Sequence, residues 1–530
     1  MPSSFANEIF PPEGKAMDSM DSIESGERSA KSGLFSDLRW VPWVLAAYFL
    51  VQAIVRIALP NSLRVDEAQQ FVVAQWLDWG YDAQPPLYNW IQQGVFAVFG
   101  TTLASLVVLK NVLLFLVYYT YHRVARLLLA DKGLAAIATL SLLTMPQMFW
   151  QAQRDLTHTV GTLLAICLFL HSVVSTLRKP SFISYASMGV WVGVGMLTKY
   201  NFILIVLATF VAVLRHPDGL KRVLDKRLLL TILLAILVFL PHGLWMTSHM
   251  SAVIDQTTRT MSEQGEGGKL SDIGNGLKEL FGTGIVIILP TAVIFLIFFR
   301  KAFLRSFRAR GEWSDFVGTI LVATLSILLL MILVVTLTEF RDRWLLPFLF
   351  LTPLYFCLKL EASGVGSAEV FRKFLYVPLT MMVVLPLVIA GSVILPKFFG
   401  SYEHLNTPYT PFLEQVVAAE GRKPAAVVTT TWQKAGNVRI NMPDTPVISI
   451  AYPLFDIDHA SIGHQPLLLV WNERDGKPST MPVSLTAWLK EKYGEALSNP
   501  EQHDMAVPYY YGREPDRYHF GYAWVYPNGK

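Results

Sequence analysis

The chain has 530 residues, of which 53% are hydrophobic and only 16% are charged, with 44 basic against 40 acidic side chains. Soluble proteins carry about 25% charged residues, so this composition excludes a soluble enzyme, a fibrous protein and a disordered chain for most of the length. No basic stripe with interleaved aromatic residues occurs outside the predicted loops, so nucleic acid is not an expected partner. Cys167 and Cys357 both lie in apolar runs, which predicts neither a disulfide framework nor a cysteine metal site.

Residues 1–40 are rich in serine, glycine and charge, and they predict a disordered cytoplasmic tail. Residues 41–395 hold long apolar runs, which predict a mainly α, polytopic membrane protein of about eleven transmembrane helices. The expected spans are 41–59, 105–121, 134–150, 159–177, 182–197, 201–214, 228–246, 283–299, 316–335, 344–358 and 374–395.

The distribution of basic residues predicts the orientation of these spans. With the N-terminus in the cytoplasm, the tail and the cytoplasmic loops hold 22 lysines and arginines, and the opposite loops hold eight. Cytoplasmic loops carry the excess of positive charge in membrane proteins. We therefore expect a multi-pass protein of the cell inner membrane whose C-terminus lies in the periplasm.

Residues 396–530 differ in composition from the spans, because charges return and the apolar runs shorten to strand length. Strands are predicted at 425–430, 447–450, 467–471 and 518–525, with a short helix at 485–493. In the last strand, alternate positions carry four aromatic side chains on one face. The segment is expected to form a periplasmic, soluble α/β domain.

The first outer loop, residues 60–102, opens with the sequence Arg64-Val65-Asp66-Glu67 and continues through Trp-Gly-Tyr-Asp to Pro85-Pro86. The pattern of Val72, Val73, Trp76 and Leu77 predicts a helix lying along the membrane interface. An aspartate held at the membrane edge is suited to act on a lipid headgroup. Alternatively, Asp66 and Glu67 are only acidic residues that the dipole favours at a helix N-terminus.

Four other outer positions combine charge or polarity with the end of a span. Arg154 and Asp155 sit in a very short loop, where a local ion pair or a helix cap is the alternative. Lys199 lies in a tight turn, where it contacts phosphate or snorkels to the interface. Arg341 and Arg343 can grip a phosphate by forked hydrogen bonds or anchor the interface. His242 follows Pro241, and a structural histidine is the alternative there.

No Walker loop, strand-associated GxGxxG or HExxH sequence occurs. Nucleotide hydrolysis and nucleotide-sugar binding are therefore unsupported. A transferase that works on the outer side would take its donor from a lipid carrier.

The combination of an Asp-Glu pair after the first span, a Trp-Gly-Tyr-Asp-x-x-Pro-Pro run, an Arg-Asp loop, a Thr-Lys turn and a late arginine-rich loop resembles the GT-C glycosyltransferases. The similarity covers about residues 41–360. Within that family, the sequence is most similar in pattern to the bacterial type related to protein O-mannosyltransferases and the lipid A aminoarabinose transferase. At Gln84 those relatives often carry lysine, so the donor sugar is not fixed by the resemblance.

The resemblance implies inverting transfer of a sugar from a polyprenyl-phosphate donor to a lipid or glycan acceptor of the envelope, on the periplasmic side. Asp66 would be the general base, and Glu67 and Asp155 would position it or the sugar. Lys199, Arg341 and Arg343 would stabilise the leaving phosphate. We hypothesise a branch that acts on lipopolysaccharide or lipid A with a uronic acid donor, without a cofactor or a metal. The full set of expected binding residues is Arg64, Tyr81, Asp82, Gln84, Arg154, Lys199, Tyr200, His242, Arg341 and Arg343.

Two other functions fit parts of the sequence. A transporter or flippase places charges within the membrane, and Arg56 and Lys110 are basic residues that no predicted loop accounts for. A membrane-anchored scaffold would bind a partner through its outer domain.

Overall fold

The computed structural model describes residues 38–81, 84–250, 268–452, 455–462, 464–472 and 477–527. Asp82 and all but the last three residues of the predicted tail 1–40 lie outside these ranges. Contacts divide the chain into Met1–Val44 and Leu45–Lys530, and the site described below lies wholly in the second unit.

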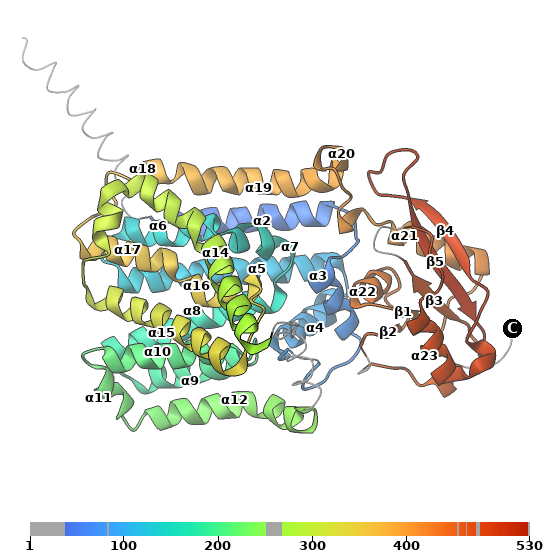
Figure 1. Ribbon diagram of the computed structural model, residues 1–530, viewed down its shortest axis with the longest axis horizontal. Helices are drawn as coiled ribbons and strands as arrows, with labels where there is room; N and C mark the ends of the chain where they lie inside the picture. Colours follow the sequence, from blue (N-terminus) through green and yellow to red (C-terminus); the bar gives the residue numbers. More distant parts are fainter. Residues whose placement is uncertain are drawn as a thin grey trace, which may run out of the picture. The chain divides into compact units, whose positions relative to one another are not determined.

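The described part of the chain before the C-terminal sheet is helical (Figure 1). Its principal helices are α2 (Val41–Ala58), α3 (Val65–Val73), α4 (Leu87–Phe99), α5 (Leu103–Leu128), α6 (Lys132–Leu140), η1 (Ser141–Thr144), η2 (Gln147–Gln151), α7 (Ala152–Arg154), α8 (Thr157–Arg178), α9 (Phe182–Met196), α10 (Phe202–Arg215), α11 (Gly219–Val223), α12 (Leu228–Ser248), α14 (Gly268–Ser306), α15 (Glu312–Val335), α16 (Asp342–Leu349), α17 (Thr352–Ala362), α18 (Phe371–Phe374), α19 (Tyr376–Ile394) and α20 (Pro396–Phe399).

Eight helices of the described residues are long and apolar enough to cross a membrane. A ninth candidate is the pair Lys132–Thr144 and Gln147–Arg154, which is bent by 73°, and α9 and α10 are shorter apolar helices. Every predicted span falls on one of these helices, so the mainly α, multi-pass fold is confirmed. The count of eleven stays a prediction, because it requires the bent pair and both short helices to be spans.

The bend in the third predicted span has a local cause. Pro146 has no backbone N–H and cannot continue the ladder of α6 and η1, so the chain breaks and resumes as η2 and α7. The sequence predicts a span over 134–150, and the structure shows that this segment is bent by 73°. The second arm reaches Arg154 and presents its polar side chains at the end of the helices.

The C-terminal segment forms a five-stranded sheet of order β2-β1-β3-β5-β4. Strands β1 and β2, and β1 and β3, pair in parallel, whereas β5 pairs antiparallel with β3 and β4. The elements are η3 (His404–Asn406), α21 (Tyr409–Glu420), β1 (Ala426–Thr429), α22 (Trp432–Asn441), β2 (Val447–Ser449), η4 (His459–Ile462), β3 (Leu467–Trp471), α23 (Val483–Tyr493), η5 (Glu495–Leu497), β4 (His503–Pro508) and β5 (Arg517–Val525).

Alternating side chains of the strands fill two cores, one on each face of the sheet. Val427 and Phe520 pack with α21 and α22 on one face, and Val428 and Ala523 pack with α23 on the other. All four aromatic residues of β5 contact the first core, as the alternation predicts. The small α/β domain is confirmed, although the exposed strand β4 is absent from the prediction.

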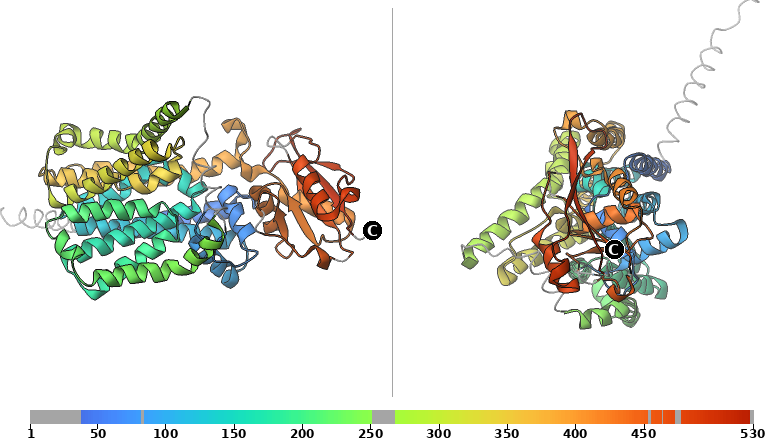
Figure 2. Two further views of the ribbon diagram at one scale, coloured as in Figure 1. Left: turned by 60° about the horizontal axis from the view of Figure 1, so that its bottom comes forward. Right: turned by 90° about the vertical axis from the view of Figure 1, so that its right-hand side faces the viewer.

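Helix α3 joins the first outer loop to this domain. Val72 belongs to the first core of the sheet, and the Trp76 ring stacks on Phe455 with centroids 4.7 Å apart. The helix is shorter than predicted, because α3 ends at Val73 and does not reach Trp76 or Leu77. Its place along the membrane interface stays a prediction. Figures 1 and 2 show α3 and α4, in blue, between the helices and the sheet.

The contact between α3 and α22 is close because Gly436 lies against the backbone of Ala68. Next to it, the Leu63 backbone N–H donates to the Asn437 side chain at 2.6 Å, and that amide donates back to the Leu63 carbonyl at 3.1 Å. The Gln75 side chain pairs with both backbone groups of Val447, at 2.8 and 2.9 Å. The C-terminal domain therefore fixes both ends of α3.

We expect Gly436→Leu to lower the midpoint of thermal unfolding in detergent (Tm) and to expose the C-terminal domain to protease, because an added Cβ would overlap the Ala68 backbone. The matched change Gly94→Leu, where nothing lies within 4 Å of an added Cβ, should not lower Tm. Wild-type protease resistance in Gly436→Leu would contradict the packing described here.

Candidate functional site

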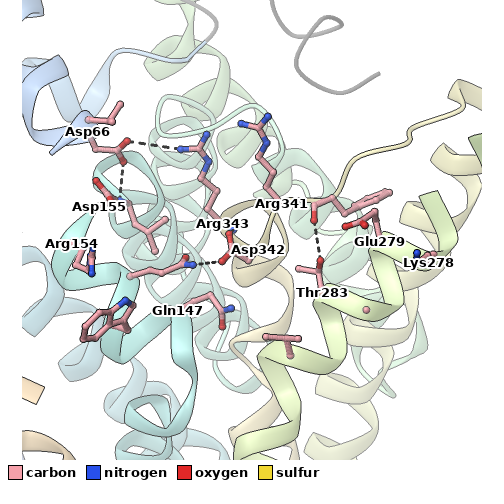
Figure 3. Close-up of a pocket in the computed structure, with 17 residues that line it drawn as sticks. Asp66, Gln147, Arg154, Asp155, Lys278, Glu279, Thr283, Arg341, Asp342 and Arg343 are labelled. Carbon is pink, nitrogen blue, oxygen red and sulfur yellow. Dashed lines mark hydrogen bonds and ion pairs between the residues drawn. The ribbon is translucent and has the colours of Figure 1, made fainter. Parts of the chain in front are cut away.

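A cavity of about 1140 Å³ opens at one end of the helices, the end at which α3 lies. Its walls come from the start of α3, the second arm of the bent pair, α14, and the start of α16 with the two residues before it. Figure 3 shows the charged side chains of these elements facing one another across the cavity. Five of the predicted site residues line it: Asp66, Arg154, Asp155, Arg341 and Arg343.

Asp66 is fixed by the N-terminus of α8. Its Oδ2 accepts hydrogen bonds from the backbone N–H groups of Leu156 and Thr157, at 2.9 and 3.3 Å. Leu156 has φ +72°, a conformation that costs a non-glycine residue free energy and that tends to persist at functional sites. The other oxygen, Oδ1, lies 3.9 Å from Arg343 Nη1. One oxygen therefore holds the carboxylate in place, and the other faces the cavity.

Glu67 points away from the cavity into a buried ion pair. Arg56 donates to both carboxylate oxygens, at 3.0 and 2.9 Å, and the Arg64 backbone N–H donates at 3.1 Å. Burial alone would raise the pKa of Glu67. The charge and hydrogen bonds of Arg56 outweigh burial and bring the pKa down to about 2. Glu67 therefore stays ionised and links α3 to α2. This pair also explains why a basic residue, Arg56, occurs in a predicted span.

Asp155 lies in the cavity wall beside Asp66. Burial and the Asp66 charge raise the pKa of Asp155 above its usual value, although the Lys110 ammonium opposes the shift. Lys110, on α5, is 4% exposed and donates to the Gln153 carbonyl at 3.3 Å. The sequence shows Lys110 only as an unexplained cation within or beside a span, and the structure brings it near both aspartates.

Arg154 makes a forked pair with Glu403, at 2.8 and 3.1 Å, rather than with its neighbour Asp155. Glu403 follows the last span and also lies 4.0 Å from Arg64. No motif marks Glu403 in the sequence, and only the fold brings it here. The C-terminal segment therefore holds two of the predicted binding arginines.

Arg341 and Arg343 lie side by side above the cavity (Figure 3). Arg341 makes a surface pair with Glu339 at 3.3 Å and lies over the Trp344 ring, 5.5 Å from its centroid. Among the described residues, the one ion pair of Arg343 is its 3.9 Å approach to Asp66. Between them, the Asp342 carboxylate accepts a hydrogen bond from Gln151. The two guanidinium groups are therefore positioned to take an anion together.

The remaining predicted residues lie outside the cavity lining. Lys199 donates to the Thr159 hydroxyl at 2.8 Å. His242 contacts the Tyr200 hydroxyl at 3.0 Å and the Trp79 carbonyl at 2.7 Å, which fits the structural alternative. The Tyr81 hydroxyl accepts from Gln93 at 2.7 Å. Gln84 does not line the cavity, and Asp82 is outside the described residues.

Among the described residues, no three histidine, cysteine or acidic side chains lie close enough to hold a metal ion. A metal-free site therefore stays a prediction. The cavity brings together a fixed carboxylate, Asp66, and two cations, Arg341 and Arg343.

Comparison with known proteins identifies the family. The profile of the dolichyl-phosphate-mannose-protein mannosyltransferase family matches residues 83–245. The lipopolysaccharide core galacturonosyltransferase RgtB of Rhizobium johnstonii is 40% identical over 92% of this chain and 98% of its own length. RgtA of the same organism, also a lipopolysaccharide core galacturonosyltransferase, is 35% identical over 91% and 97%. The chain belongs to the GT-C glycosyltransferases.

The same fold occurs in ArnT from Cupriavidus metallidurans, in the crystal structure bound to undecaprenyl phosphate. That structure has a TM-score of 0.58 at 13% identity and covers 91% of this chain and 98% of ArnT. The resemblance seen in the sequence is confirmed, and the chain is a glycosyltransferase. The transporter and scaffold alternatives are set aside.

A purely structural role for Glu67 has a measurable consequence. We expect Glu67→Gln to destabilise the enzyme by roughly 3–5 kcal/mol, because it leaves Arg56 buried without its counter-charge. The double variant Arg56→Met/Glu67→Met removes both charges and should recover much of the lost Tm. A Glu67→Gln enzyme with wild-type Tm and no transfer would instead place Glu67 in the chemistry.

Proposed function

We propose that this glycosyltransferase moves a hexuronosyl group from a polyprenyl-phosphate donor to the core of lipopolysaccharide, with inversion, on the periplasmic side of the inner membrane. The observation that carries the proposal is Asp66, which is fixed on α8 and faces Arg343 across the cavity. The name of the 40% identical relative supports a galacturonosyl donor and a lipopolysaccharide core acceptor. The ligand of the ArnT structure supports a polyprenyl phosphate.

In this mechanism an acceptor hydroxyl attacks the anomeric carbon as the bond from that carbon to the phosphate oxygen breaks. Asp66 takes the hydroxyl proton, which is the task of a general base. The phosphate leaves with an added negative charge, and Arg341 and Arg343 stabilise that charge. The atoms balance in one displacement, which inverts the anomeric centre.

The cavity also fits the proposed orientation. The predicted outer loops contribute Asp66, Asp155 and Arg343 to one site, whereas the cytoplasmic loops carry the excess of basic residues. Both placements agree with a donor that approaches from the periplasmic leaflet. We place the C-terminal domain on the same side, because it holds α3 and Arg154.

The Asp66→Asn enzyme tests the base. Asparagine keeps an oxygen that can accept the two α8 hydrogen bonds, so we expect wild-type Tm. Transfer should fall by roughly 10²–10⁴-fold, since the amide cannot take the proton. The measurement is transfer from a synthetic polyprenyl-phosphate hexuronate to purified lipopolysaccharide.

The matched control is Asp78→Asn in the same loop, where the carboxylate accepts a hydrogen bond from the Trp79 N–H at the surface. This variant should keep full activity. A folded Asp66→Asn enzyme with wild-type transfer would rule out the base assignment.

A further inference from the structure

Six buried polar side chains near Asp66 carry atoms without hydrogen-bond partners among the described residues. We call them the buried polar cluster. Nine of their polar atoms have no partner among the residues that the structure describes. The members are Gln70, Tyr88, Asn89, Gln92, Thr157 and His158.

The cluster comes from three helices that meet at α4. Gln70 is one helical turn after Asp66 on α3, and Gln92 is one turn after Tyr88 on α4, so each pair shares a helix face. The rings of Tyr88 and His158 lie 5.7 Å apart. Helix α4 contacts α3, α5 and α8, and the Leu87 N–H donates to the Leu197 carbonyl at 3.1 Å.

Burial makes this arrangement costly. Gln70 and Gln92 are fully buried, Tyr88 is 1% exposed and His158 is 4% exposed. An unpaired polar group away from water costs free energy, and native proteins contain few such groups. So many at one place indicate that their partner is a polar molecule that is not part of the chain.

The neighbouring charges indicate where that molecule reacts. Asp66 binds the Thr157 N–H at 3.3 Å, so the general base lies at the border of the cluster. The charges of Asp66 and Lys199 both act on His158, and those of Asp66 and Arg343 act on Lys199. Lys199 donates one hydrogen bond, to the Thr159 hydroxyl, and makes no ion pair among the described residues.

We infer that the buried polar cluster binds the hydroxyl groups of the sugar being transferred, and that Lys199 pairs with the carboxylate of that sugar. This inference rests on the proposed function. A sugar offers several donors and acceptors in a small volume, which matches amide, imidazole and hydroxyl side chains. Resemblance to the family assigns Lys199 to the phosphate. Its contacts favour the sugar, because Arg341 and Arg343 already face the cavity as a pair.

The Gln92→Leu enzyme tests the cluster. Leucine has a similar size and removes two unpaired atoms, so we expect Tm to stay the same or rise by about 2–4 °C. Transfer should fall at least about tenfold, because the sugar loses its hydrogen bonds. The control is Gln52→Leu, which removes a buried amide that donates to the Tyr48 hydroxyl at 2.9 Å. This control should lower Tm and keep transfer per folded enzyme.

Two outcomes would overturn the cluster assignment. One is a Tm loss in Gln92→Leu like that of Gln52→Leu, which would mean that resident water completes the cluster as part of the fold. The other is unchanged transfer. A wild-type enzyme that moves no sugar from any polyprenyl phosphate would instead defeat the proposed function. In that case, thermal shift by the free hexuronic acid, compared between wild type and Gln92→Leu, still tests the cluster.

The Lys199→Met enzyme tests the carboxylate contact with two donors that differ only at C6, a hexuronate and the corresponding hexose. We expect hexuronosyl transfer to fall by about 10- to 100-fold and hexosyl transfer by less than about threefold, since only the first donor carries the charge that lysine pairs with. Lys359→Met is the control, because this lysine is also largely buried but lies beside the Ala309 carbonyl. It should keep the wild-type ratio of the two rates.

A phosphate role for Lys199 gives a different result. Both donors would then lose rate equally, and binding of bare polyprenyl phosphate would weaken in Lys199→Met. That outcome would overturn the carboxylate assignment and leave the proposed transfer reaction intact.

Discussion

The position of α3 is the constraint on which the rest of the site depends. The helix has nine residues, which is too short for a helix to be stable without packing. It is held from three sides: Arg56 binds Glu67, α22 packs against Ala68, and the α8 N-terminus binds Asp66. Adjacent residues therefore have opposite tasks. The Glu67 carboxylate binds Arg56 and stabilises the fold, whereas one oxygen of Asp66 faces the cavity.

This arrangement gives the C-terminal domain a role in the geometry of the site. The domain binds α3 through Asn437 and Arg154 through Glu403. Its own first core is completed by Val72 of the outer loop. Because the two parts share a core, the domain cannot shift without moving the carboxylate. The helices supply most of the cavity wall, and the C-terminal domain helps to set the position of the carboxylate that faces it.

Much of this fold follows from the sequence, because apolar runs report burial in lipid and alternation reports strands. The Asp66 and Arg343 positions are also predictable, since polar residues at span ends are few. The bend at Pro146 does not follow from the sequence in the same way. The proline is visible inside an apolar run, but the sequence does not indicate in which direction the chain continues after it. Glu403 lies about 250 residues from Arg154 along the chain, and no local pattern predicts that pair.

The buried polar cluster was missed for a related reason. Tyr88 and Gln92 stand in a short loop helix whose sequence reads as amphipathic, and a glutamine there suggests a solvated face. Only the packing of α4 against α3 and α8 removes that solvent. Polar residues of this kind are recognisable as binding groups once their burial and their missing partners are both known.

The distances between arginines and carboxylates distinguish the arginines that stabilise the fold from those available to a substrate. Arg56 and Arg154 bind carboxylates of the chain within 3.1 Å through two hydrogen bonds each. A substrate would have to break those pairs and leave the buried Glu67 or the partly buried Glu403 without its cation. The ion pairs of Arg341 and Arg343 among the described residues are an exposed pair and a 3.9 Å approach, and such contacts contribute little free energy. An incoming anion displaces these contacts at little cost in free energy, so the weakly paired arginines are the ones suited to the leaving phosphate of the proposed reaction.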